Sequence, residues 1–222
     1  MSRQSKSVQV KICGLLTPET VKAAVEAGAD YIGFNFYPRS PRYVTPQKAA
    51  ELAALMPASV LKVALAVDAD DATLDAIMAA LDPDILQLHG DETSQRLVEL
   101  KSRYGVTLMK AIPIAGPEDP IKSEIYRDSA DLLLFDAKPP KSMKNALPGG
   151  NGLAFDWSLL AGQKPEIPWM LSGGLTVDNV REAIEATGAE AVDVSSGVED
   201  APGRKNPELI RKFIQAAKAV DV

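Results

Sequence analysis

The sequence has few of the residues on which disulfide scaffolds, metal clusters and membrane spans depend. It contains one cysteine, Cys13, and one histidine, His89, in 222 residues. A single cysteine leaves no internal disulfide and no cluster of thiolate ligands. No apolar run approaches the ~18 residues of a membrane span, and the polar residues 1–7 lack the apolar segment of a signal peptide. We therefore expect a soluble cytoplasmic protein with a disordered lead over residues 1–7 and no membrane partner.

Basic charge is also scarce. The 24 Lys and Arg residues are outnumbered by 30 Asp and Glu residues, which gives a net charge of −6. This balance argues against nucleic-acid binding, which needs a basic face. It still permits a small anionic ligand, because backbone amides supply local positive potential without lysines. The 46% hydrophobic and 24% charged content is typical of a folded domain.

The chain does contain a repeated alternation of short apolar runs and longer amphipathic ones. The short runs predict strands over residues 8–12, 31–36, 60–67, 84–88, 106–112, 131–135, 169–171 and 190–194. The longer runs predict helices over residues 17–28, 45–56, 71–81, 92–103, 117–127, 155–160, 177–186 and 207–219. The longest irregular stretch is 139–152, and no linker composition separates two halves.

Eight strand–helix units predict an α/β fold with a parallel sheet covered by helices. An open doubly wound sheet usually announces itself by a glycine-rich first turn, which Cys13-Gly14-Leu15-Leu16 lacks. We therefore predict one (β/α)8 TIM-barrel catalytic domain over residues 8–222. In such a barrel the working residues lie at the carboxyl ends of the strands and in the loops that follow them.

Two strand-end residues have side chains suited to proton transfer. Cys13 ends the first strand and is either a small buried hydrophobe or a base, which requires positive potential nearby to favour its thiolate. Asp136 ends the sixth strand directly after four apolar residues. Partial desolvation there favours the protonated carboxyl group, an acid. The alternative for Asp136 is a helix cap or a loop carboxylate.

Other polar residues follow the second and fourth strands. Arg39 and Arg42 lie in a connection rich in proline and arginine. A guanidinium fork suits bidentate capture of a carboxylate, although solvated loop arginines are common. His89 ends the fourth strand, where a lone histidine is more often a hydrogen-bonded structural residue than a catalyst.

Glycine-containing turns follow the last two strands, at residues 172–175 and 195–199. Barrels frequently bind phosphate at this place through backbone amides and the N-terminus of a short extra helix. Glycine allows the backbone to approach a ligand closely. Asp193 lies two residues before the second turn, where it either binds a ligand hydroxyl or fixes the turn.

Short motifs with these residues occur in a specific order and spacing along nearly the whole chain. They are KICG at 11–14, GFNFYP at 33–38, SPRY at 40–43, QLHG at 87–90, LFD at 134–136, FDW at 155–157, LSGGL at 171–175 and DVSSGVE at 193–199. With these motifs the chain resembles the phosphoribosylanthranilate isomerase family of tryptophan biosynthesis. The resemblance implies an Amadori rearrangement of N-(5-phosphoribosyl)anthranilate to 1-(2-carboxyphenylamino)-1-deoxyribulose 5-phosphate, with a phosphosugar substrate as partner and no metal or organic cofactor.

The resemblance also implies roles for individual residues. Asp136 is the general acid that protonates the ribose ring oxygen, Cys13 is the general base that removes the C2′ proton, and Arg42 binds the anthranilate carboxylate. His89 lines the family's pocket and is a secondary substrate contact, and Asp193 is a further candidate substrate contact from its place before the second glycine turn. The phosphate cradle is formed by Gly173, Gly174, Ser196 and Gly197. The chain departs from the expected pattern at Asn151, where serine or threonine is expected; asparagine tolerates the same turn conformations.

Two other functions remain to be compared with this one. A histidine-pathway isomerase performs the same rearrangement but carries aspartate at the position of Cys13. A barrel that binds a sugar phosphate without turnover predicts loss of the acid or the base, and this chain has both. Nothing in the sequence decides between a monomer and a homodimer.

Overall fold

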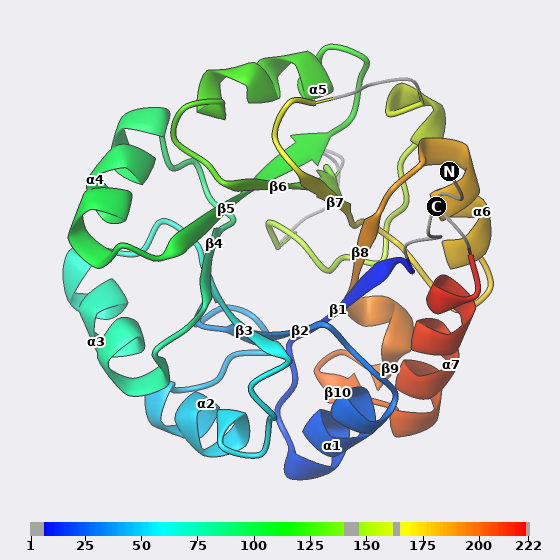
Figure 1. The fold of residues 1–222 in the computed structure, drawn as a ribbon, viewed down its shortest axis with the longest axis horizontal. Helices are drawn as coiled ribbons and strands as arrows, with labels where there is room; N and C mark the ends of the chain where they lie inside the picture. The colour runs from blue at the N-terminus through cyan, green and yellow to red at the C-terminus, as the bar shows by residue number, and fades with distance from the viewer. Residues whose placement is uncertain (1–6, 140–146, 162–164, 221–222) are drawn as a thin grey trace, which may run out of the picture.

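Eight parallel strands close into a barrel in chain order, and β1 completes the circle by pairing with β8. The computed structural model describes residues 7–139, 147–161 and 165–220. The strands are β1 (Gln9–Cys13), β2 (Tyr31–Asn35), β3 (Leu61–Ala66), β4 (Ile85–Leu88), β5 (Thr107–Ile114), β6 (Leu132–Ala137), β7 (Trp169–Leu171) and β8 (Ala191–Val194). Figure 1 looks along the barrel and shows the strands as an inner ring enclosed by helices. The predicted TIM barrel is confirmed.

The outer ring consists of helices that follow the strands. They are α1 (Pro18–Glu26), α2 (Pro46–Ala53), α3 (Asp71–Leu81), α4 (Ser94–Tyr104), α5 (Asp119–Lys122), α6 (Val180–Thr187) and α7 (Pro207–Lys218), with short 3-10 helices η1 (Ser123–Tyr126), η2 (Trp157–Leu159) and η3 (Ser196–Val198). Thr17 and Thr45 start α1 and α2 by accepting a backbone N–H three residues on. Proline at the first helical position follows each cap, where its missing N–H costs nothing.

The observed elements differ from the predicted ones in three places. The helix expected over 117–127 is divided into α5 and η1, and the one expected over 155–160 is only the three-residue η2. An antiparallel hairpin after β8, formed by β9 (Glu199–Ala201) and β10 (Arg204–Lys205), was not predicted. Strands of two and three residues are too short to show a hydrophobic period. The lead over residues 1–7 lies outside the described residues except for Ser7, so its disorder stays a prediction.

The barrel interior has an apolar half and a polar half. Side chains from β2 to β8 form a closed cluster: Tyr31, Val63, Ile85, Met109, Ala111, Leu134, Met170 and Ala191. Nearer the carboxyl ends of the strands the buried residues include Lys11, Gln87, Asp136 and Asp193. Because side chains alternate along a strand, Lys11 and Cys13 of β1 lie on the same face. The apolar half fills one end of the barrel interior, and the polar half places charged and amide side chains at the carboxyl ends of the strands.

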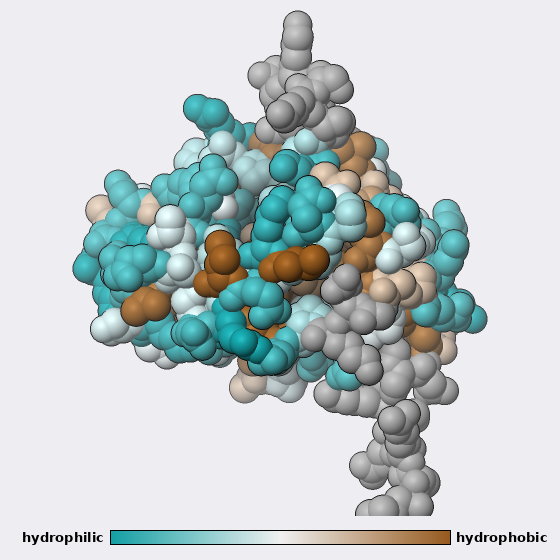
Figure 2. All heavy atoms as spheres, turned by 90° about the horizontal axis from the view of Figure 1, so that it is seen from above, coloured by the Kyte–Doolittle hydropathy of each residue, from teal (hydrophilic) through white to brown (hydrophobic). Residues whose placement is uncertain are grey.

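The outer surface is mostly polar. Figure 2 shows small separate apolar patches among hydrophilic residues on one face. Large apolar side chains that are exposed among the described residues are Tyr43, Leu55, Leu61, Val98, Ile121 and Ile125. None of the described helices has the length and apolar character that crossing a membrane requires.

Candidate active site

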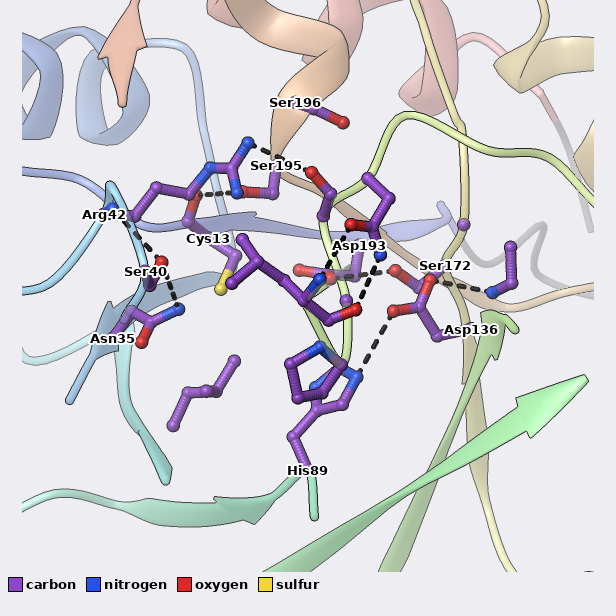
Figure 3. Close-up of a pocket in the computed structure, with 18 of the residues that line it drawn as sticks. Cys13, Asn35, Ser40, Arg42, His89, Asp136, Ser172, Asp193, Ser195 and Ser196 are labelled. Carbon is purple, nitrogen blue, oxygen red and sulfur yellow. Dashed lines mark hydrogen bonds and ion pairs between the residues drawn. The ribbon is translucent and has the colours of Figure 1, made fainter. Parts of the chain in front are cut away.

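A cavity at the carboxyl ends of the strands collects nearly all the residues predicted to be functional. It is lined by Cys13, Arg42, His89, Asp136, Gly173, Gly174, Asp193 and Ser196. Gly197 is not among the lining residues, but it packs against the adjoining turn. Arg39, the second arginine considered, is exposed in the loop after β2. Figure 3 shows the labelled side chains around this cavity, with the sulfur of Cys13 and the carboxyl group of Asp136 both facing it.

The acid and the thiol are both buried. Cys13 at the end of β1 is 4% exposed and Asp136 in β6 is 5% exposed. One oxygen of Asp136, Oδ1, accepts the backbone N–H of Ala137 at 2.9 Å. The other oxygen, Oδ2, lies 3.3 Å from Nε2 of His89. Among the residues that the structure describes, the Asp136 side chain faces the cavity and caps no helix, which argues against the interpretation of Asp136 as a helix cap.

His89 connects Asp136 to a buried amide. Nε2 of Gln87 lies 3.1 Å from Nδ1 of His89. When the amide donates to Nδ1, the neutral ring carries its proton on Nε2, the nitrogen that faces the Asp136 carboxyl group. Gln87 lies in β4 and His89 directly follows the strand, two positions on, so both side chains point into the barrel. His89 thus has a polar partner on each side, a hydrogen-bonded amide and the carboxylate of the candidate acid.

The electrostatics of Cys13 combine burial with nearby lysines. Burial raises the pKa of the Cys13 thiol, while the ammonium groups of Lys11 and Lys205 act in the opposite direction. Lys11 is fully buried and donates a hydrogen bond to Oδ1 of Asp193 at 2.9 Å. Oδ2 of Asp193 accepts the hydroxyl of Ser172 at 3.1 Å. Although burial works to lower it, Asp193 holds the pKa of Lys11 above its ordinary value.

The loop after β2 presents Arg42 to the cavity. Asn35 donates to Oγ of Ser40 at 3.3 Å, and the same oxygen accepts the backbone N–H of Arg42 at 3.1 Å. The guanidinium then donates through Nε and Nη2 to the two oxygens of Glu199, at 2.7 and 2.8 Å. Nη2 also lies 3.2 Å from the backbone oxygen of Gly150. The fork is therefore already occupied by a carboxylate of the protein.

Glu199 and Lys205 belong to the site but were not singled out in the sequence. Nζ of Lys205 donates to Oε1 of Glu199 at 2.7 Å and to the backbone oxygen of Ser195 at 2.8 Å. Burial works to raise the pKa of Glu199, but Arg42 and Lys205 hold it below its ordinary value. Burial lowers the pKa of Lys205 to about 8. The only signal for Glu199 in the sequence was its place in the motif at 193–199.

The glycine turns after β7 and β8 are packed against each other and against the loop after β6. A Cβ on Gly197 would lie 1.8 Å from the backbone oxygen of Leu175, and one on Gly174 would lie 2.4 Å from the backbone nitrogen of Ala154. Gly173 and Gly174 have φ of 87° and 64°, a region that favours glycine. These contacts leave no room for side chains, so backbone atoms form this part of the surface.

The loop after β6 lies directly over the acid. A Cβ on Gly149 would come within 2.5 Å of Oδ2 of Asp136 and 2.8 Å of the ring of His89. Asn151 fixes the turn, because its amide accepts the N–H of Leu147 at 3.1 Å and donates to the oxygen of Leu147 at 2.7 Å. Asparagine thus fills this position with a turn-closing role of its own.

A closed barrel with an acid, a thiol, an arginine and glycine turns around one cavity at the strand ends defines the class of the protein as a TIM-barrel enzyme. Comparison with known proteins specifies the family. A model of the N-(5′-phosphoribosyl)anthranilate isomerase family matches residues 10–216. The isomerase of Parvibaculum lavamentivorans is 72% identical over 96% of this chain and 99% of its own length. That of Paracoccus denitrificans is 56% identical over 96% of this chain and 98% of its own.

Solved structures agree with this assignment. Phosphoribosyl anthranilate isomerase from Thermotoga maritima is 34% identical, with a TM-score of 0.85 over 96% of this chain and 100% of that one. A complex of the isomerase with reduced 1-(o-carboxyphenylamino)-1-deoxyribulose 5-phosphate has a TM-score of 0.82 and 33% identity, over 96% of this chain and 100% of that one. The chain belongs to the phosphoribosylanthranilate isomerase family, enzymes of tryptophan biosynthesis. The resemblance inferred from the motifs is confirmed.

Proposed function

We propose that the chain carries out the family's reaction by general acid/base catalysis, with Asp136 as the acid and Cys13 as the base. The reaction converts N-(5-phosphoribosyl)anthranilate to 1-(2-carboxyphenylamino)-1-deoxyribulose 5-phosphate. The observation that supports these roles is the burial of both groups around one cavity, on strands β6 and β1. Ring opening needs a proton donor and enolisation needs a proton acceptor at the adjacent carbon, so two groups on different strands suit the two steps.

In the first step, Asp136 donates its proton to the ribose ring oxygen. The bond between that oxygen and C1′ breaks, and the anthranilate nitrogen supplies the electrons that form a protonated Schiff base. The carboxylate left on Asp136 keeps the N–H of Ala137 as a donor, and His89 lies within reach of its other oxygen. Hydrogen bonds to an ionised carboxylate are stronger than those to its neutral form, so these contacts stabilise the product side of the step.

In the second step, the thiolate of Cys13 takes the proton from C2′. The electron pair of the C–H bond moves into the C1′–C2′ bond, and the iminium electrons return to nitrogen, giving an enolamine. Tautomerisation of the enolamine then yields the ketone. The protonated imine makes the C2′ hydrogen acidic, which reduces the strength of base that the step demands.

The rest of the cavity binds the two anionic ends of the substrate. Arg42 faces the anthranilate carboxylate, and the turns that contain Gly173, Gly174, Ser196 and Gly197 receive the phosphate. Backbone amides of such turns supply positive potential in a chain that is negative overall. His89 and Asp193 are contacts at the edge of the pentose. A homologue from Thermotoga maritima is described as dimeric, and this chain is a monomer or a homodimer in the cytoplasm.

Replacement of Asp136 tests the proposal. Asp136→Asn keeps the shape of the side chain but removes the proton donor, and general acids contribute roughly 10²–10⁴-fold to rates. We expect kcat to fall by about that factor while product affinity changes little, measured by loss of substrate fluorescence and by product titration. Asp131→Asn is a matched control just before the same strand, where the carboxylate contacts Lys101 and Leu108.

The same assay separates catalysis from mere binding. Near-normal turnover in Asp136→Asn contradicts the acid role. A folded wild-type protein that binds the product but does not convert the substrate supports the alternative of a sugar-phosphate binding barrel.

A further inference from the structure

A buried series of hydrogen-bonded polar residues, Lys11, Asp193 and Ser172, lies next to Cys13 and has no part in the two proton transfers. Lys11 donates to Asp193, which in turn accepts from Ser172, at 2.9 and 3.1 Å. All three residues are less than a tenth exposed. A buried ion pair contributes little net stability compared with apolar groups of the same volume. A contribution to folding stability therefore does not explain the ion pair at the centre of the barrel.

The geometry places the ammonium beside the thiol. Lys11 and Cys13 are two positions apart on β1, and because side chains alternate along a strand, both point to the same side. Gly33 of β2 is the register partner of Cys13 and lies close to both side chains: a Cβ there would be 2.9 Å from the Cys13 sulfur and 3.3 Å from Cε of Lys11. The absence of a side chain at Gly33 lets the two groups share one space. Asp193 is the register partner of Lys11 on β8, which fixes the lysine from the other side.

The charges facing Cys13 come from three elements. Lys11 on β1 and Lys205 on β10 favour the thiolate, whereas Asp193 on β8 opposes it. Of these groups, Lys11 has the largest effect on the pKa of Cys13. The Asp136 and His89 pair lines the same cavity from β6 and the end of β4. β2 and β7 contribute the uncharged Gly33 and Ser172.

We infer that Lys11 is a positioning residue that stabilises the thiolate form of Cys13, and that the Asp193 carboxylate, which holds Lys11 in place, limits this stabilisation by its own negative charge. The inference rests on the proposed role of Cys13 as the base. When the free thiol ionises, its proton passes to solvent and the sulfur remains beside the Lys11 ammonium. Asp193 then acts on the thiol through its own charge, in addition to any contact with the pentose.

Titration of the thiol without substrate tests this inference. The chain has one cysteine, so alkylation by iodoacetamide, followed by intact mass, reports Cys13 alone. The rate rises with pH as the thiolate forms. In Lys11→Met, which keeps a similar length without the charge, we expect the midpoint to move upward and the rate near neutral pH to fall at least about tenfold. In Asp193→Asn, which removes the opposing carboxylate, we expect the midpoint to move downward.

Opposite shifts in the two variants distinguish a specific electrostatic role from a structural one. Lys110→Met is the matched control: this lysine is also buried and paired with a carboxylate, Glu92, at 2.9 Å, but on β5. Its profile must coincide with that of the wild type. A Lys11→Met midpoint equal to the wild-type midpoint, or shifts of the same sign in Lys11→Met and Asp193→Asn, overturns the inference.

Two further outcomes keep the test decisive. If circular dichroism shows that Lys11→Met is unfolded, the Asp193→Asn profile is judged alone, and an unchanged or raised midpoint overturns the inference. The titration is also independent of turnover. An active Cys13→Ser variant contradicts the base role, whereas a wrong titration result contradicts only the role of Lys11.

Discussion

The buried ammonium of Lys205 makes the stability of the protein depend on alkaline pH in a predictable direction. Its side chain is 1% exposed and contacts Glu199 at 2.7 Å. Burial lowers its pKa from the ordinary value of 10.5 to about 8. Lys205→Met replaces the ammonium with an apolar group of similar length. Glu199 keeps its ion pair with Arg42 in this variant, so no buried carboxylate is left alone.

The magnitude follows from linkage between protonation and folding. Each pKa unit corresponds to about 1.4 kcal/mol, so lowering the pKa from 10.5 to about 8 destabilises the folded wild type by about 3 kcal/mol at neutral pH. Below the pKa that Lys205 has in the folded state, the lysine is protonated in both the folded and the unfolded protein, and the destabilisation is fully present. Between the two pKa values the unfolded state binds more protons, so the stability of the wild type rises with pH. The variant lacks this contribution.

Urea unfolding at two pH values measures the effect. We expect the free energy of unfolding of the wild type, relative to Lys205→Met, to increase by about 2 kcal/mol between about pH 7.5 and about pH 9.5. Lys48→Met, at an exposed lysine on α2, corrects for the loss of a positive charge in general. If the difference between wild type and Lys205→Met is independent of pH or changes in the other direction, the assignment of Lys205 as a destabilised buried ammonium is refuted.

Two further predictions concern the base and the phosphate turns. Cys13→Ser is expected to lower kcat severely, because an alcohol is a far poorer base than a thiol near neutral pH; a variant with normal kcat, or an alkylated wild type that stays active, contradicts the base role. Gly197→Ala places a methyl group 1.8 Å from the oxygen of Leu175, so we expect a loss of about 1–3 kcal/mol in urea unfolding and weaker inhibition by inorganic phosphate. Unchanged values for both contradict the close packing of the two turns.

The sequence was sufficient for the barrel because its signals are local. A strand such as β6 is a continuous apolar run, and caps such as Thr17-Pro18 and Thr45-Pro46 mark helix starts within three residues. Eight repeats of this pattern leave few topologies, since parallel strands need helical crossovers on their faces. The positions of Cys13 and Asp136 at the mouth follow directly from the strand ends.

The partners of the site residues were not predictable in the same way. Glu199 lies 157 positions from Arg42 along the chain, and Asp193 lies 182 positions from Lys11. These pairs form only when β8 closes against β1, and the hairpin that holds Glu199 is too short to show a period. Exposed lysines and glutamates look the same in a sequence as buried ones. Only the closed barrel shows that these charges are withdrawn from water.

The occupied fork of Arg42 changes how recognition of a carboxylate is understood. A free guanidinium would bind an anthranilate carboxylate through two parallel hydrogen bonds, but Nε and Nη2 already contact Glu199. Arg42, Glu199 and Lys205 together hold two positive charges and one negative charge, all with side chains at most 5% exposed. In the proposed role, this cluster attracts one carboxylate by its net charge of one, and selectivity comes from the cluster as a unit rather than from the fork. Glu199 keeps the guanidinium at the cavity wall in advance, so that substrate binding does not have to immobilise a long side chain.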